Sequence, residues 1–372
     1  MQTIFSFAKR EIVLLLSLLA AALSMLIVPP DITYAEYIDT SVLILLFCLM
    51  AVVAGFRHTG VFDLLSQQVL SRVHSVRALS LALAGLCFFT SMLITNDVAL
   101  LTFVPLTLSL MQECREDAVI FVVVLETVAA NMGSLMTPVG NPQNLFLFTY
   151  YDMSLGAFLK LTLPLGLISL LLLLVLIRSQ RNAPLPVLEG KERPPLKKRL
   201  ALEYGLLFLV CILAVLKIIP HWLCLVVLVL CLALTDRKVF REIDYSLLLT
   251  FVCFFIFVGN LGHLPGLQEQ LHQWLSQRAL LAGALMSQVI SNVPAAIMLA
   301  PFTENAPALL LGVDIGGLGT LVASLASLIS FKAYCQSAHG KKGRYLLVFS
   351  GVNLLLLALL LPVGKLILLE MV

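Results

Sequence analysis

The chain has 372 residues, of which 60% are hydrophobic and only 12% charged, and its mean hydropathy is +1.03. A soluble domain is about a quarter charged, and a disordered chain needs high charge and low hydrophobicity, so this composition excludes both. The net charge of +3 gives no reason to expect a nucleic-acid partner, and we predict an all-α polytopic membrane protein embedded in the lipid bilayer.

Apolar runs recur along the whole chain. In chain order they are 12–28, 41–56, 78–94, 98–111, 118–135, 145–150, 155–177, 201–219, 221–234, 245–262, 279–290, 293–302, 308–329 and 345–369. One helical crossing needs about 20 apolar residues, so several of these runs are too short to cross alone. The first run follows Lys9 and Arg10 and lacks a small-residue cleavage site, and we expect it to be an uncleaved span.

The basic residues assign the two sides of the membrane. The segments 178–200 and 331–344 are rich in lysine and arginine, and short basic loops stay in the cytoplasm. The acidic segment 29–40 suits the outside. We therefore predict about nine full spans, provided that 78–112 and 279–304 each enter and leave on one face. The N-terminus is then cytoplasmic and the C-terminus periplasmic or extracellular, while the depth of the two returning tips stays open.

A polar interruption occurs in each half of the chain with the same spacing. The distance from Asn96 to Pro105 equals the distance from Asn292 to Pro301. In the predicted topology the first copy enters from the cytoplasm and the second from outside, which is the inverted-repeat plan of secondary transporters. Chance similarity between two leucine-rich stretches is the alternative interpretation.

We therefore predict two inverted repeats, each with a re-entrant hairpin and a broken helix. The boundaries are 1–177 for the first repeat, with its hairpin at 78–112 and its broken helix at 118–150, then 178–200 for a flexible cytoplasmic linker, and 201–372 for the second repeat, with its hairpin at 279–304 and its broken helix at 306–331. Breaks of this kind expose helix N-termini that suit anions. They also free carbonyl oxygens that can coordinate a small cation.

Three carboxylates, Asp97, Glu126 and Asp314, fall inside apolar stretches. A charged side chain there costs about 2.5–3.5 kcal/mol on insertion scales, and such residues commonly line ion paths or proton relays. Asp97 is the first candidate for coupling transport to H⁺ or Na⁺. Glu126 and Asp314 are further candidates, for which a role in helix packing is the alternative.

Four motifs resemble those of one ion transporter superfamily over nearly the whole chain. Residues 95–100 resemble the NDGAAL hairpin tip of arsenite/antimonite permeases and sodium/proton antiporters, and 291–295 resemble their NNMPT tip. Residues 136–144 are similar to the TPIGTPPN of divalent-anion symporters and citrate permeases, and 312–326 to the GANLGPN…GSLA of the arsenite branch. The chain thus resembles an inner-membrane permease of this group.

The resemblance implies alternating access, a homodimer, and a site at the hairpin tips and broken helices, with Na⁺ as a possible metal ion at the tips. The residues that it assigns to substrate and ion binding are Thr95, Asn96, Ser291 and Asn292 at the tips, Thr137, Pro138 and Asn141 on the first broken helix, and Ser324 and Ser327 on the second. Asp97 stands where a symporter tip has threonine, which favours proton coupling or the arsenite branch.

We therefore expect a secondary active transporter of a small anion, citrate-like or dicarboxylate-like, in the cell inner membrane. Arsenite or antimonite efflux and sodium/proton antiport are the alternatives. An enzyme is not expected, because the sequence has no HExxH or GxSxG motif. No P-loop is present to bind ATP, and no cofactor is expected.

Overall fold

A computed structural model describes residues 11–70, 73–184, 196–264, 266–337 and 340–370. Residues 1–10 and 185–195, which include Lys9, Arg10 and the middle of the predicted linker 178–200, lie outside this range. In the described residues the regular elements are helices, which confirms the all-α prediction, and no strand occurs there. Six of these helices are long and apolar enough to cross a membrane, as a polytopic membrane protein requires.

The elements are α2 (Ile12–Met25), α3 (Tyr34–Tyr37), α4 (Thr40–Arg57), α5 (Val61–Leu70), α6 (Val76–Ile94), α7 (Asn96–Leu110), α8 (Glu116–Ser134), α9 (Pro142–Tyr150), α10 (Leu155–Ser179), α11 (Lys198–Val215), α12 (His221–Thr235), the short 3₁₀ helix η1 (Arg237–Arg241), α13 (Tyr245–Gly262), α14 (Leu267–Leu275), α15 (Ala279–Ile290), α16 (Asn292–Leu299), η2 (Ala300–Phe302), α17 (Ala306–Gly316), α18 (Leu325–Gln336) and α19 (Lys342–Leu369). The helices that qualify as membrane spans are α4, α6, α8, α10, α13 and α19.

The apolar runs predicted most of these helices within a few residues. The runs 221–234 and 245–262 coincide with α12 and α13. The first run, 12–28, forms a helix of only 14 residues, α2, which ends at Met25. Pro29 and Pro30 follow closely, and the residue before a proline is disfavoured in the helical conformation.

Two pairs of helices meet at sharp polar corners. Helices α6 and α7 join at Thr95, and α15 and α16 join at Ser291. The two corner residues have almost the same backbone angles, φ 72° and ψ 152° at Thr95 and φ 79° and ψ 154° at Ser291. Helix α6, at 19 residues, is as long as a spanning helix, whereas α7, α15 and α16 are shorter.

The two predicted helix breaks occur at matching places after these corners. Residues 135–141 separate α8 from α9, and residues 317–324 separate α17 from α18. Each corner pair packs beside the broken helix that follows it, α6 against α8 and α15 against α17. The second arm of each pair also contacts the other half of the chain, because α7 packs on α18 and α16 packs on α9.

Close approach of each first arm to its broken helix depends on glycine. A Cβ added at Gly133 in α8 would collide with the carbonyl oxygen of Phe88 in α6. A Cβ added at Gly312 in α17 would lie 2.5 Å from the carbonyl oxygen of Leu280 in α15. Backbone contact of this kind is the usual way in which helices associate tightly inside a membrane.

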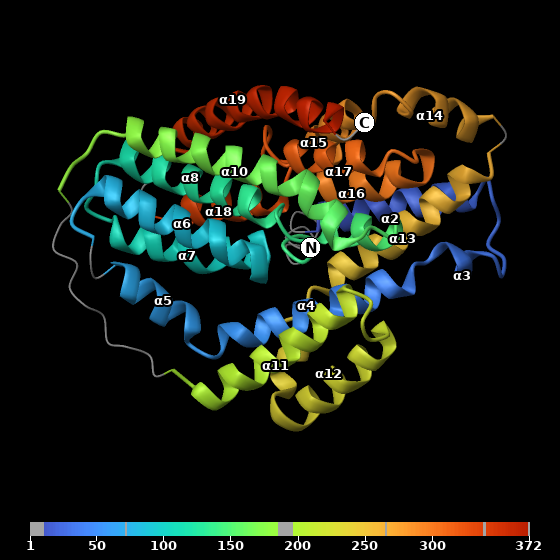
Figure 1. The fold of residues 1–372 in the computed structure, drawn as a ribbon, viewed down its shortest axis with the longest axis horizontal. Helices are drawn as coiled ribbons and strands as arrows, with labels where there is room; N and C mark the ends of the chain where they lie inside the picture. Colours follow the sequence, from blue (N-terminus) through green and yellow to red (C-terminus); the bar gives the residue numbers. More distant parts are fainter. Residues whose placement is uncertain (1–10, 71–72, 185–195, 265, 338–339, 371–372) are drawn as a thin grey trace, which may run out of the picture.

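Figure 1 shows where the outer helices lie. Helices α4, α11 and α12 lie together along one side, and α4 packs against both of the others. The amphipathic helices α5 and α14, which precede the two corner pairs in the chain, lie at opposite ends of the molecule (Figure 1). The large leucines exposed on the outward faces of α11 and α12, including Leu206 and Leu230, are the surface that lipid covers in a membrane protein.

Candidate functional site

The two corners dock on the two helix breaks in the same way. The backbone N–H of Asn96 donates to the carbonyl oxygen of Gly140, at 3.2 Å, in the first break. The backbone N–H of Asn292 donates to the carbonyl oxygen of Ala323, at 3.0 Å, in the second break. Each asparagine side chain also accepts from the N–H of the following residue, at 3.0 Å in both cases. The predicted tips and breaks therefore do come together, as two local sites with the same geometry.

The corner residues hold strained backbone. The angles of Thr95 and Ser291 fall in a region that only glycine adopts readily, and occupying it costs another residue about 1–3 kcal/mol. Strain of this kind persists where the surrounding structure requires it and is concentrated at functional sites. The hydroxyl of Ser291 accounts for part of the requirement, because it donates to the carbonyl oxygen of Ala323 at 3.4 Å.

Replacing Thr95 with glycine should therefore stabilise the protein by about 1 kcal/mol, because glycine removes the strain and loses part of that gain to its greater chain entropy. Thermal unfolding in detergent measures the effect as a higher Tm. Thr102→Gly is the matched control, because Thr102 lies in the regular part of α7, where glycine should destabilise by about 0.5 kcal/mol. A lower Tm for Thr95→Gly would contradict the strained corner.

Asn131 in α8 joins the first corner to the second broken helix. Its side-chain oxygen accepts from Asn96 Nδ2 at 3.0 Å and from Ser324 Oγ at 3.1 Å. Its own Nδ2 is buried and has no hydrogen-bond partner in the described part of the chain, and the same is true of Ser327 Oγ. A buried donor without a partner is costly, so this centre offers hydrogen-bond donors to a bound group.

The first break is held by side chains of its own segment. Asn141 caps α9, accepting from the backbone N–H of Asn144 at 3.1 Å, and its Nδ2 donates to Ser134 Oγ at 3.2 Å. The Thr137 hydroxyl donates to the carbonyl oxygen of Met92 in α6 at 2.5 Å. Pro138 is buried in the break and lacks an N–H to satisfy. Of the three predicted residues of this segment, Thr137 therefore links the break to the first arm of the corner pair.

The second break is held by a residue that the sequence did not single out. Gln288 in α15 donates through Nε2 to the carbonyl oxygens of Gly316 and Leu318, at 2.8 and 2.9 Å. Its Oε1 accepts from the backbone N–H of Thr320 at 2.9 Å. Backbone that leaves a helix at membrane depth must find partners in the protein, and Gln288 supplies three of them.

The three intramembrane carboxylates lie in different surroundings. Glu126 is buried and accepts through Oε1 from the Thr107 hydroxyl at 2.6 Å, which ties α8 to α7. Asp314 is buried and accepts through Oδ1 from Gln143 Nε2 of α9 at 3.4 Å. Asp97, in the first turn of α7, is partly exposed and interacts electrostatically with the carboxylate of Asp244. No ion pair to any of the three occurs among the residues that the structure covers.

Two of the unpartnered acceptor atoms belong to Asp314 in α17 and to Asn144, which follows the first break in α9. Asp314 Oδ2 and Asn144 Oδ1 are buried without a hydrogen-bond partner in the described residues. The side chains of Asn141 and Asn144 both lie close enough to Asp314 to interact with it. Oxygen atoms of this kind suit a proton or a small hard cation. Within the described ranges no cluster of histidine, cysteine and carboxylate side chains has the geometry of a metal site.

A small cavity lies beside the second corner. Its volume is about 60 Å³, and its wall includes Ser291, Val293 and Pro294 from the corner together with Asp244 and Leu325. Asp244 caps the first turn of α13, accepting from the backbone N–H of Leu247 at 3.0 Å. The cavity therefore separates the second corner from the start of α13, and its size suits a small ion or a water molecule.

Similarity to known proteins extends over most of the chain. The family model for the citrate transporter matches residues 3–327. The inner membrane protein YbiR of Escherichia coli is 35% identical over 299 residues, which are 79% of this chain and 80% of that protein. The uncharacterized transporter MJ0456 of Methanocaldococcus jannaschii is 31% identical over 327 residues, 86% of this chain and 88% of that protein. The silicon efflux transporter LSI3 of Oryza sativa subsp. japonica is 33% identical over 138 residues, 37% of this chain and 28% of that protein.

Proposed function

The chain belongs to the citrate transporter family, and from that premise we propose that it moves a small anion, citrate-like or dicarboxylate-like, across the cell inner membrane by alternating access coupled to H⁺ or Na⁺. The chain is a transporter and not an enzyme, since its family is one of transporters and the relative MJ0456 is named as a transporter. The observation that carries the anion assignment is the centre at Asn131, which joins the corner of the first half to the broken helix of the second and has unpartnered buried donors from both halves, Asn131 Nδ2 and Ser327 Oγ.

The donors and the acceptors have separate roles in this proposal. The anion binds at the donor side, where Asn131 Nδ2, Ser327 Oγ and the N-termini of the helix segments favour negative charge. The coupling ion binds at Asp97, which is the one of the three carboxylate residues that is partly exposed. Glu126 and Asp314 are sealed in the protein and hold helices together through Thr107 and Gln143.

The way in which the corners dock supports alternating access. We propose that the two halves are inverted repeats, 1–177 and 201–372, on either side of the cytoplasmic linker, that the N-terminus is cytoplasmic and the C-terminus outside, and that the protein works as a homodimer. A site built from both halves, α7 on α18 and α16 on α9, can face one side and then the other when these packed elements move together.

Efflux of a small uncharged solute or of arsenite is the second candidate. The negative charge of Asp97 at the first corner repels an anion but tolerates a neutral solute, and part of the chain is similar to a protein named as a silicon efflux transporter. Sodium/proton exchange would use the same carboxylate without any solute. Anion transport, efflux and sodium/proton exchange therefore predict different ligands that stabilise the protein.

Ligand-dependent thermal unfolding of the purified protein tests the proposal. A ligand that binds the folded state stabilises it and so raises Tm. At a ligand concentration of a hundred times Kd the free energy of unfolding increases by about 2.7 kcal/mol. We expect citrate or a dicarboxylate from a panel of citrate, succinate, malate, phosphate and arsenite to raise Tm, and Asn131→Ala to lose that shift. Stabilisation by arsenite alone would support efflux, and stabilisation by Na⁺ alone would support the antiporter.

A further inference from the structure

The junction between α4 and α5 has the features of a hinge. His58 follows the last residue of α4, and Thr59 and Gly60 separate it from α5, with Gly60 at φ 79°. Helix α5 leads in turn to α6, the first arm of the corner pair that carries Thr95. The other half has a matching junction between α13 and α14, where His263 precedes Gly266 at φ 78°.

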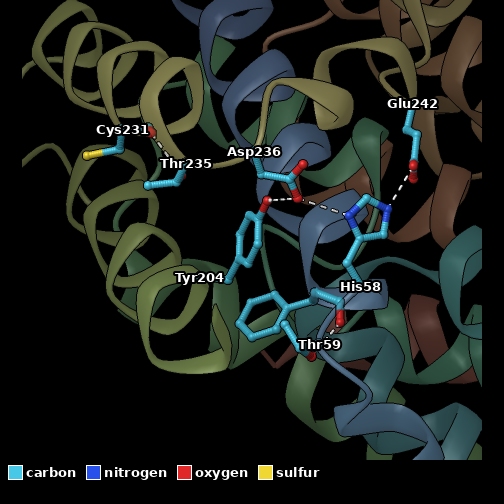
Figure 2. A network of polar contacts seen from close by, with 8 residues as sticks. His58, Thr59, Tyr204, Cys231, Thr235, Asp236 and Glu242 are labelled. Carbon is cyan, nitrogen blue, oxygen red and sulfur yellow. Dashed lines mark hydrogen bonds and ion pairs between the residues drawn. The ribbon is translucent and has the colours of Figure 1, made fainter. Parts of the chain in front are cut away.

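Both ring nitrogens of His58 contact carboxylates (Figure 2). Nδ1 lies 3.0 Å from Asp236 Oδ2, and Nε2 lies 2.7 Å from Glu242 Oε1. Asp236 lies between α12 and η1, and Glu242 directly follows η1. The Tyr204 hydroxyl of α11 donates to the same oxygen of Asp236 at 3.1 Å. The end of α4 is thereby fastened to both helices that pack along it.

This geometry requires a protonated imidazole. A neutral imidazole has one N–H and one acceptor nitrogen, whereas an ionised carboxylate only accepts. Both contacts are hydrogen bonds only when His58 is an imidazolium that donates from each nitrogen. Partial burial lowers the pKa of His58, but the hydrogen bonds to Asp236 and Glu242 outweigh burial and raise it above its ordinary value. The pKa of Asp236 shifts down, since the hydrogen bonds from His58 and Tyr204 outweigh desolvation.

The segments that meet at this cluster carry further charged residues. They are Arg57 of α4, Asp63 of α5, Glu203 of α11, Arg237, Lys238 and Arg241 of η1, Asp244 before α13, and Lys197 before α11. The backbone N–H of Lys197 donates to the carbonyl oxygen of Thr59 at 3.0 Å, which adds a second fastening at the hinge. Only Asp236 and Glu242 form ion pairs with His58 among the residues described.

The matching histidine in the other half has different partners. His263 Nδ1 lies 2.9 Å from the carbonyl oxygen of Gly259 and 3.4 Å from the Tyr37 hydroxyl. Asp31 interacts with it electrostatically without forming an ion pair. A neutral imidazole satisfies these contacts, because one N–H donated to the carbonyl is sufficient. The two hinges therefore differ in their dependence on protonation.

We propose that His58 is a pH-sensitive clamp on the hinge between α4 and α5, closed when the imidazole is protonated and released when it is neutral. The clamp responds to pH on the side of the membrane that holds the basic linker 178–200. Its effect on transport rests on the proposed function, because releasing α5 frees the arm that leads to the first corner. Rising pH on that side then increases the rate of transport.

Hydrogen exchange of the hinge segment 56–66, compared between the wild type and His58→Gln at each pH, tests the clamp without any substrate. The folded-state pKa is raised, so the stabilisation is complete below the ordinary histidine pKa of about 6.5 and is lost as the pH rises through the folded value. We expect the variant to exchange about threefold faster near pH 6 and at the wild-type rate near pH 9. A ratio that does not change with pH would overturn the clamp.

Two further variants separate the clamp from a general structural role. Glu242→Gln removes one of the two carboxylates, so it should move the hinge transition to lower pH while keeping its shape. His263→Gln, the matched control, should leave the exchange of segment 56–66 at its wild-type pH dependence. An unshifted transition in Glu242→Gln would overturn the assignment even if His58→Gln failed to fold.

Transport into liposomes, with the pH of each side varied separately, tests the regulatory consequence. The wild type should respond to pH on the linker side, and His58→Gln should transport at a high rate that no longer depends on that pH. If hydrogen exchange of the hinge is altered in His58→Gln but the pH profile of transport is unchanged, the proposed regulation of transport is wrong, while the clamp itself is still supported. Absence of transport in the wild type would count against the proposed function, while hydrogen exchange would still decide the clamp.

Discussion

Replacing Asn96 with alanine is expected to reduce gradient-driven transport at least about 100-fold while the protein remains folded in the membrane. The substitution removes the hydrogen bond to Asn131 Oδ1 and leaves the N–H of Asp97 without its side-chain acceptor. A buried group left unsatisfied costs about 1–3 kcal/mol. If the substitution destabilises one conformation of the transport cycle by about 2.7 kcal/mol relative to the others, the population of that conformation, and with it the transport rate, falls about 100-fold. Uptake of labelled anion into liposomes measures the effect.

Asn353→Ala is the control for this experiment. Asn353 is also a buried asparagine, but it lies in α19, and its side chain donates to the carbonyl oxygen of Phe349 in its own helix. Its removal should change stability more than transport. Normal uptake by Asn96→Ala, or an equal loss in both variants, would contradict the assignment of the first corner to the site.

Asp97→Asn should uncouple transport from the driving gradient. Asparagine keeps the size of the side chain but has no charge and binds no proton, so an imposed gradient has no group through which to act. One coupled proton and one pH unit can support about tenfold accumulation of substrate. In the variant we expect accumulation to vanish, while exchange of labelled for unlabelled anion continues because the donors at Asn131 are intact.

Glu126→Gln separates a coupling role from the general effect of removing a buried charge. Its Oε1 partner, the Thr107 hydroxyl, can still donate to the amide oxygen of glutamine. We expect this variant to accumulate substrate. If Asp97→Asn accumulates substrate and Glu126→Gln does not, the coupling ion binds at Glu126 in α8 and not at the first corner.

The corners and the breaks could be predicted from the sequence because polar residues and prolines interrupt long apolar runs. Thr-Asn-Asp at 95–97 and Ser-Asn at 291–292 stand inside apolar stretches, where polar groups and freed backbone must find partners in the protein. The resemblance to the transporter superfamily assigned Asn141 to the site, and Asn141 caps the helix that begins at Pro142. These signals are local in the sequence, so one sequence is sufficient to find them.

The residues that connect the two halves could not be predicted in this way. Asn131 and Gln288 are single amides within helices, and their partners depend on packing between distant segments. The Asn131 contact with Ser324 spans 193 residues. The roles of Glu126 and Asp314 were left open for the same reason, because coupling and packing carboxylates look alike until their neighbours are known.

The carboxylate partners of His58 could not be predicted from the sequence either. In sequence it is a lone histidine at the end of an apolar run, a position that is common at a membrane interface. Its partners Asp236 and Glu242 lie 178 and 184 residues further along the chain. Only the packing of α4 against α11 and α12 brings them within hydrogen-bonding distance.

In the proposed function an ion gradient drives a small anion across the membrane, and Asp97 binds the coupling ion. The most direct measurement is uptake of labelled citrate, succinate, malate, phosphate and arsenite by the purified protein in liposomes, under an imposed pH or sodium gradient, for the wild type and Asp97→Asn. We predict that one carboxylate anion accumulates against its gradient in the wild type and not in the variant. Exchange of protons for sodium with no anion moved would contradict anion transport and the anion site at Asn131.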